Sequence, residues 1–160
     1  MITVRCETGC DVHIDAESLA GASFAGFELH RALLAGADLQ GADFSGAGLR
    51  SAYAIGADFS RCLFQRAILA ACEASQANFS HADLTQAMMR SGVFDGANFS
   101  GANVRHAAVD GARFSGAVFC GASLAQCEGL DTADLSGAVY DRCTTWPRDL
   151  DPEARGMVCV

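Results

Sequence analysis

Large apolar residues recur at every fifth position of the chain. Between Ile14 and Leu124, 21 of the 23 positions in this register are Leu, Phe, Ile, Val or Met, and the exceptions are Ala54 and Ala74. Nine of the ten phenylalanines fall in the register, and only Phe27 lies outside it. Two residues before these positions the chain is small, with Ala at 17 of the 23 sites, and two residues after them it is Gly at 11. The repeating unit therefore reads A-(D/N)-(L/F)-x-G.

A period of five fits neither an α-helix nor a flat strand. Apolar positions recur every 3.6 residues on a helix face and every two residues on a strand face. Five residues of helix turn by about 500°, so a fifth-residue stripe would wind around the helix. A coiled ribbon does fit, because each unit then forms one side of a coil with its large and small residues pointing inward. We therefore expect an all-β solenoid with a filled interior.

Runs such as GADLQGADFSGAGL and GANFSGANV resemble the pentapeptide-repeat family, and the resemblance covers residues 12–145. It implies a right-handed quadrilateral β-helix in which four repeat units close one coil. Period five alone does not distinguish a square coil from a triangular one. With coils stacked at the strand spacing of about 4.8 Å, the resemblance predicts about 6–7 coils and a rod of roughly 32 Å.

When four units make a coil, the large residues align in columns. One column forms a core stack of Leu39, Phe59, Phe79, Phe99 and Phe119. Another column contains Ala54 and Ala74 on neighbouring coils, so two coils lack a large inward residue on that side. Either the lumen narrows there, or Phe44 and Phe64 fill the space from an adjacent side. A functional cavity is the third interpretation.

The residue before each large one points outward and is the candidate for binding a partner. Two sides are polar and mildly acidic at this position, and their candidates are Asp38, Asp43, Asp58, Asn78, Asp83 and Asn98. The other two sides expose apolar residues, and their candidates for an apolar interface are Leu33, Tyr53, Ile55, Ile68, Met88 and Val93. An apolar patch can mark a contact surface, although scattered exposed hydrophobic residues are also normal.

The pattern stops at both ends of the chain. We expect an N-terminal cap at 1–11, the β-helix at 12–145 and a C-terminal cap at 146–160, with one register slip near 125–129. Trp146 is expected to plug the lumen, and the Pro152 region looks like a helix start. The resemblance implies a homodimer through this C-terminal end, with Trp146 and Leu150 at the contact.

The cysteines and histidines do not form a recognisable catalytic or metal site. Cys62, Cys72 and Cys143 take the small inward position, where a free thiol behaves as a slightly larger alanine. The cluster of Cys6, Cys10 and His13 has weak spacing for zinc and no evident fourth ligand, so we expect free thiols.

No histidine gains a carboxylate or nucleophile in its own column at the next coil, and no phosphate loop is present. We expect a protein that is not an enzyme and that has no metal or cofactor.

Charge narrows the range of partners. The chain has 11 Arg and Lys residues, none of them lysine, against 19 acids, which gives a net charge of −8. Residues 1–17 carry −3, residues 18–127 carry −1 and residues 128–160 carry −4. This balance argues against direct binding to nucleic acid or to an anionic membrane. No apolar run approaches the ~18 residues of a membrane span, and we expect a soluble cytoplasmic protein.

The resemblance also implies a function. Several pentapeptide-repeat proteins are DNA mimics that bind DNA gyrase or topoisomerase IV and inhibit it or protect it from quinolone-like poisons, which links them to antibiotic resistance. A duplex of about 32 Å carries about 19 charges, far more than this chain's −8. We therefore expect the chain to copy the shape of a DNA duplex, but only part of its negative electrostatic potential. The alternative is a structural or interaction module with an unidentified protein partner.

Overall fold

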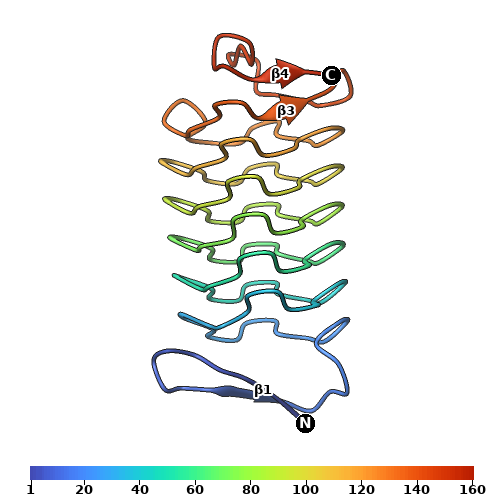
Figure 1. Ribbon diagram of the computed structural model, residues 1–160, viewed down its shortest axis with the longest axis vertical. Helices are drawn as coiled ribbons and strands as arrows, with labels where there is room; N and C mark the ends of the chain where they lie inside the picture. Colours follow the sequence, from blue (N-terminus) through green and yellow to red (C-terminus); the bar gives the residue numbers. More distant parts are fainter.

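The computed structural model describes residues 1–160 as a rod of stacked coils (Figure 1). Its named strands are short: β1 (Ile2–Val4), β2 (Val12–Ile14), β3 (Val139–Tyr140) and β4 (Val158–Cys159). Between β2 and β3 the coils are joined by isolated parallel bridges rather than by long strands. The structure contains no helix that could span a membrane.

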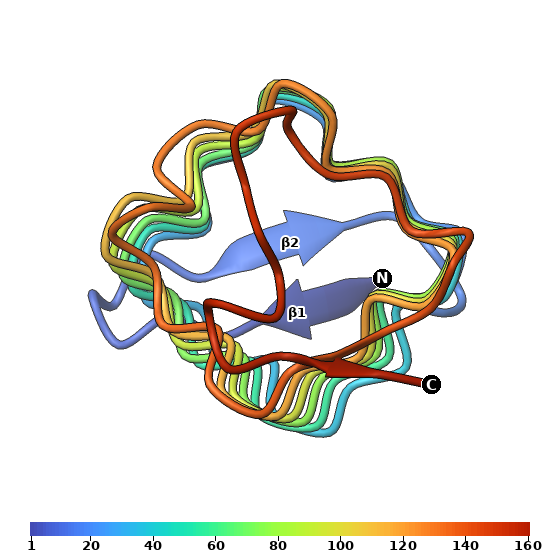
Figure 2. The same cartoon turned by 90° about the horizontal axis from the view of Figure 1, so that it is seen from above.

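Each regular coil is made of four repeat units. From Ser23↔Asp43 to Ala108↔Glu128, every bridge joins a residue to the one four units later, and one bridge occurs in every unit. Seen along the rod axis, the coils superpose as a four-sided outline (Figure 2). The five-residue period is therefore one side of a square coil, as the sequence pattern and the resemblance predicted.

A tight turn forms each corner. The carbonyl of Leu39 accepts the N–H of Ala42 at 3.0 Å, and the intervening Gly41 has φ 69°. This is a type II turn, which needs a positive φ at its third residue and favours Gly there. Ala71 occupies the same position with φ 54°, at a cost of roughly 1 kcal/mol relative to Gly. The glycines of the repeat thus mark the corners of the coil.

The interior is filled by aromatic stacks. Phe59, Phe79, Phe99 and Phe119 lie one above another, with successive ring centroids 5.1, 5.0 and 5.2 Å apart. The Phe24–Phe44–Phe64 stack runs along the next side, at 4.7 and 5.0 Å. All of these rings are essentially inaccessible to water. The stacking distance is close to the strand spacing, because each ring follows the coil that carries it.

Phenylalanines from the adjacent and the opposite side fill the lumen at Ala54 and Ala74, since Phe44 and Phe64 lie on the side opposite these alanines. Both alanines are completely buried, and Phe59 packs edge-on against Phe44 and Phe64 at 5.8 and 5.2 Å. Further along the rod Phe94 replaces alanine in the same column. There the column on the opposite side changes from Phe64 to Leu84 and Val104, so the large side chains exchange sides across the lumen. The structure therefore favours filling by phenylalanine over a functional cavity.

Gly92 occupies a position where other coils have alanine, and the reason is steric. A Cβ on Gly92 would lie 2.5 Å from the ring of Phe94, and that ring is held in place by stacking on Phe114 at 5.3 Å. We expect Gly92→Ala to destabilise the fold by about 1–3 kcal/mol through overpacking, measured by urea unfolding. Ala112→Gly, one coil later, makes the reverse change at the equivalent position, where it removes a fully buried methyl group and increases backbone freedom without any steric overlap. A G92A variant as stable as the parent would contradict the packing explanation.

The N-terminal end of the rod is covered by a hairpin. β1 and β2 pair antiparallel, with Ile2 opposite Ile14, and they lie across the first coil (Figure 2). Val4 and Ile14 are buried against the core. The covering element spans residues 2–14, so it extends past the cap boundary predicted at residue 11.

The last coils contain two extra residues, whereas the sequence predicted one slip near 125–129. The bridge offset becomes 21 at Arg113↔Asp134 and 22 at Ser123↔Thr145. At the first step the hydroxyl of Thr132 accepts the N–H of Gly111 at 3.0 Å. At the second step a carboxylate oxygen of Asp141 accepts the N–H of Gly121 at 2.8 Å. Side-chain acceptors thus replace the backbone carbonyls that the widened turns displace.

Two further expectations are wrong near the C-terminal end of the chain. Cys143 is exposed rather than inward, because the extra residue moves it into the turn. The segment around Pro152 forms turns and no helix. The chain after Thr145 crosses the end of the rod, and β4 then pairs parallel to β3 (Figure 2).

Candidate protein-binding surface

The outer surface consists of four sides, each with one outward row of residues at the bridges. Face 1 has the row Asp38, Asp58, Asn78, Asn98 and Val118, and face 2 has Asp43, Leu63, Asp83, Asn103 and Ser123. Face 3 has Glu28, Gly48, Ile68, Met88, Ala108 and Glu128, and face 4 has Leu33, Tyr53, Glu73, Val93, Arg113 and Asp134. Rows of this kind are the rod's candidate contact residues.

The six predicted polar candidates on faces 1 and 2 also close their own turns. Each accepts the backbone N–H of the residue two positions later, at distances of 2.9–3.2 Å for Asp38, Asp43, Asp58, Asn78, Asp83 and Asn98. Asp and Asn favour such local turns because their side-chain oxygen reaches that N–H. These residues therefore have a structural role that the sequence analysis did not anticipate, and the D/N of the repeat is explained by it.

Amide side chains link successive coils on face 1. The Asn78 amide donates to a carboxylate oxygen of Asp58 at 3.1 Å, and the Asn98 amide donates to the Asn78 oxygen at 3.4 Å. In the outward row of face 1 only Asp38 and Asp58 are charged, and the other residues are neutral. The surface offers hydrogen-bonding groups more than a continuous line of anions.

Asp83 on face 2 is held in its ionised form. Burial raises its pKa, but hydrogen bonds from the Thr85 hydroxyl at 2.5 Å and the Gln65 amide at 2.6 Å outweigh burial, and the pKa is lowered overall. A hollow of about 420 Å³ beside it is lined only by Ser45, Gly46, Gln65, Arg66, Thr85 and Gln86. This part of face 2 is polar throughout, apart from Leu63, which is 41% exposed.

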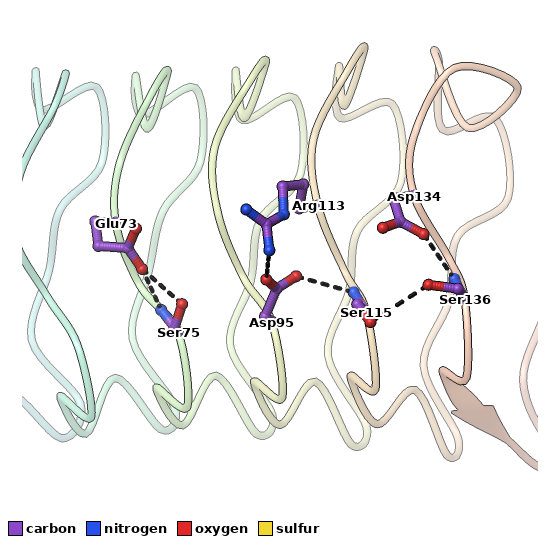
Figure 3. Close-up of polar contacts among 7 residues, drawn as sticks. All are labelled: Glu73, Ser75, Asp95, Arg113, Ser115, Asp134 and Ser136. Atoms are coloured by element: carbon purple, nitrogen blue, oxygen red, sulfur yellow. Dashed lines mark hydrogen bonds and ion pairs between the residues drawn. The ribbon is translucent and has the colours of Figure 1, made fainter.

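Face 4 is apolar at one end and acidic at the other. Figure 3 shows the acidic part, where the Ser75 hydroxyl donates to Glu73 at 2.6 Å and the Ser115 N–H donates to Asp95 at 3.1 Å. Arg113 pairs with Asp95. The outward row alone shows Glu73 and Arg113 among apolar residues, and it does not include Asp95, which lies in the turn.

Asp134 belongs to the same acidic part of face 4. The hydroxyl and N–H of Ser136 lower its pKa, and the charges of Arg113 and Arg155 lower it further. Its carboxylate oxygen accepts the Ser136 N–H at 3.0 Å (Figure 3). Asp134 is therefore ionised on the surface at neutral pH.

The predicted apolar interface is not one patch. Leu33 and Ile55, each 48% exposed, lie with half-buried Tyr53 at the first coils of face 4. Met88, 39% exposed, and half-buried Ile68 are bridged to each other on face 3. Val93 is half-buried between Glu73 and Arg113. The structure separates these six candidates into two groups.

The histidines and cysteines do not converge on a site. His30 has a carboxylate beside it, since Glu28 of the same coil lies 2.9 Å from its Nε2, but both side chains are exposed. His13 contacts the Thr3 hydroxyl at 2.9 Å instead of joining Cys6 and Cys10. No group of three His, Cys, Asp or Glu side chains is arranged to hold a metal ion.

Trp146 and Leu150 pack on the end of the aromatic stack. The Trp146 ring lies 5.8 Å from Phe119 and 5.9 Å from Tyr140, and both rings are edge-on to it. Its indole N–H is buried without an acceptor. Leu150 is partly buried against the same core. The C-terminal segment therefore covers the lumen with one aromatic side chain.

Comparisons with known proteins identify the repeat. The family described as "Pentapeptide repeats (8 copies)" matches residues 18–50, 43–86, 57–96 and 97–128. No curated protein sequence matches the chain significantly.

Solved structures share the fold at low identity. HetL, a pentapeptide repeat protein involved in heterocyst differentiation regulation from the cyanobacterium Nostoc sp. strain PCC 7120, is 23% identical over 86% of this chain, with a TM-score of 0.58. Rfr23 from the cyanobacterium Cyanothece 51142 is 20% identical over 79% of this chain and 89% of its own, with a TM-score of 0.59. A trypsin-treated form of QnrB1, a plasmid-mediated fluoroquinolone resistance protein, is 21% identical over 83% of this chain and 67% of its own, with a TM-score of 0.64. The chain spans 64% of the length of HetL.

Proposed function

Because this chain belongs to the pentapeptide-repeat family, we propose that it is a non-catalytic protein whose outer surface binds another macromolecule. The filled interior is the observation that carries this proposal. The columns of Phe, Leu and Ala are buried along the whole rod, so no internal site remains for a substrate. The exposed rows are shallow and convex, which suits contact with a large partner better than enclosure of a small one.

The specific partner we propose is a type II topoisomerase, DNA gyrase or topoisomerase IV. The rod would occupy the DNA site of the enzyme, inhibiting it or protecting it from quinolone-like poisons. The square rod is shared with QnrB1, a fluoroquinolone resistance protein, and the net charge of −8 has the sign that a DNA mimic needs. The acids of faces 1, 2 and 4 supply part of this charge along the rod. The proposal includes a cytoplasmic location, where gyrase acts.

A homodimer joined at the C-terminal ends belongs to the same proposal. It would double the length of the rod and bring two acidic segments of −4 each together at its centre. Trp146 and Leu150 lie at that end.

Gyrase supercoiling with and without a fluoroquinolone tests the topoisomerase proposal. We expect the protein to inhibit supercoiling, or to restore it in the presence of the drug, at micromolar concentration. The variant D38N/D43N/D58N/D83N removes four charges, whereas the side-chain oxygen that closes each turn is kept. Asn78, Asn98 and Asn103 already serve this role. The variant should fold normally and lose most of the effect.

A lack of both inhibition and rescue at tens of micromolar would remove the topoisomerase proposal. The remaining interpretation is then an interaction module with an unidentified protein partner. The likeness to HetL, which is involved in a regulatory process, favours this second candidate.

A further inference from the structure

Face 3 has an order of charges that the other sides lack. The residues directly after its large inward residues, which we name the turn row of face 3, are His30, Arg50, Ala70, Arg90, Asp110 and Asp131. Along the rod, this row begins with basic side chains and ends with acidic ones. The outward row beside it is small or apolar through its centre, at Gly48, Ile68, Met88 and Ala108.

Several of these charges have no ionic partner within the chain. Arg50 is exposed and forms no ion pair, and Asp131 at the other end is also exposed and without one. Asp110 uses one carboxylate oxygen for Arg90, at 2.9 Å, and its side chain is 50% exposed. One oxygen of Asp110 is therefore free to accept a second guanidinium. Charged groups that are exposed and unpaired are available to a partner.

We propose that face 3 is a homodimer interface, on which a second copy of this chain packs side by side with its rod axis reversed. The two-fold axis runs across the face between Ile68 and Met88. Each row then meets the same row of the partner in reverse order. Arg50 meets Asp110, His30 meets Asp131, and Ile68 meets Met88.

The fit also extends to side-chain size. Gly48 lies opposite Ala108, but Gly48 is buried beneath the side chains of Glu28 and His30, so the small side chain of Ala108 leaves room for that pair. Arg90 lies opposite Ala70, which leaves room for its long side chain while it stays paired with Asp110. Because the contact is two-fold symmetric, every pairing occurs twice, and a single substitution removes two contacts.

The other three sides do not match themselves in this way. The outward row and the turn row of face 1 contain two acids and no base, and Arg61 and His81 lie one residue further along the turns. On face 2 the acids are all in the outward row, whereas Arg105 is the only base in the turn row. A reversed second copy therefore brings no opposite charges together in either row. Reversing face 4 places Leu33 against Asp134. Self-complementarity is thus a property of face 3 alone.

Like charges at the ends limit the strength of the dimer. Glu28 would face Glu128, although Glu28 is already paired with His30 at 2.9 Å. The matched region is about 24 Å long, from the strand spacing, which is small for a specific interface. We therefore expect a weak dimer with a dissociation constant in the micromolar range, and one that weakens at high salt.

Sedimentation equilibrium of the full chain between about 1 and 500 μM measures this association. Arg50→Asp and Asp110→Arg should each raise the dissociation constant about tenfold, because each places like charges opposite one another. The charge swap R50D/D110R should restore association to near the parental value. Arg105→Asp makes the same charge change at the equivalent turn position of face 2, so it should leave the dimer intact.

Two further readouts separate this interface from others. Glu128→Gln should tighten the dimer about threefold, since it removes the repulsion from Glu28. A wild type that stays monomeric at 500 μM overturns the proposal. So does an assembly whose size and dissociation constant R50D leaves unchanged. If chains also join at their C-terminal ends, face 3 links two such dimers into a tetramer, and R50D should reduce that tetramer to the end-joined dimer. A charge swap that fails to recover association overturns it as well. None of these outcomes depends on whether gyrase is bound.

Discussion

Phe79→Ala is expected to lower the free energy of unfolding by about 3–5 kcal/mol. The ring is completely buried and stacks on Phe99 at 5.0 Å with an interplanar angle of 2°, and on Phe59 at 5.1 Å. It also contacts Phe64 and Phe94 from adjacent sides, at 5.8 and 5.9 Å. Its removal leaves a cavity that rigid neighbouring rings cannot fill. Urea unfolding followed by circular dichroism measures the loss.

Phe27→Ala is the matched control, since it makes the same chemical change outside the five-residue register. Phe27 is 38% exposed and touches the core only edge-on, at 6.5 Å from Phe24. Its loss should cost roughly 1 kcal/mol or less. In a solenoid each coil contacts only its neighbours, so the F79A defect should weaken the central coils first. Equal losses for the two variants would contradict the stacked core.

Stability is expected to fall steeply above pH 9 because of three buried thiols. Burial raises the pKa of Cys62, Cys72 and Cys127 to about 12, from an ordinary value of 9.0. Since the folded pKa lies above the unfolded one, these thiols stabilise the fold fully below pH 9 and lose that contribution as the pH rises towards 12. Each changes stability by about 1.4 kcal/mol per pH unit, so the three together reach about 4 kcal/mol per unit. Urea unfolding at pH 8, 9, 10 and 11 measures the slope.

The triple variant C62A/C72A/C127A should remove most of this dependence on pH. Alanine occupies the same inward position on other coils, for example at Ala42 and Ala107, so the variant should fold. The control variant C10A/C143A/C159A changes three exposed cysteines and should keep the parental slope. The same alkaline slope in all three proteins would show that other groups cause it.

The sequence predicted the interior well, because packing there depends on one repeated choice. A large residue at every fifth position and a small one two places earlier leave few ways to bury both sets. The Phe59–Phe79–Phe99 column follows directly from this register once four units make a coil. The number of sides did not follow from the period, and the family resemblance supplied it.

The candidate surface was less predictable, since outward residues are constrained by contacts between coils that the linear sequence does not display. Asp58 was interpreted as a partner-binding acid, yet it also closes its own turn and accepts a hydrogen bond from Asn78. The sequence does not single out Asp95, because its partner Arg113 lies almost one coil further along the chain and meets it only when the coils stack. The columns of the repeat place no carboxylate beside His30 on the next coil, and its contact with Glu28 arises within its own coil.

By itself, the amino-acid sequence determined the all-β coil, its buried columns and the acidic balance of the chain. These properties depend on the identity and spacing of residues within one repeat, and hydrophobic burial selects them locally. Only the tertiary structure decided how Phe59 packs edge-on against Phe44 and Phe64, where the two widened turns lie and which charges share face 3. Those features arise from residues about one coil apart in the sequence, which become neighbours when one coil stacks on the next.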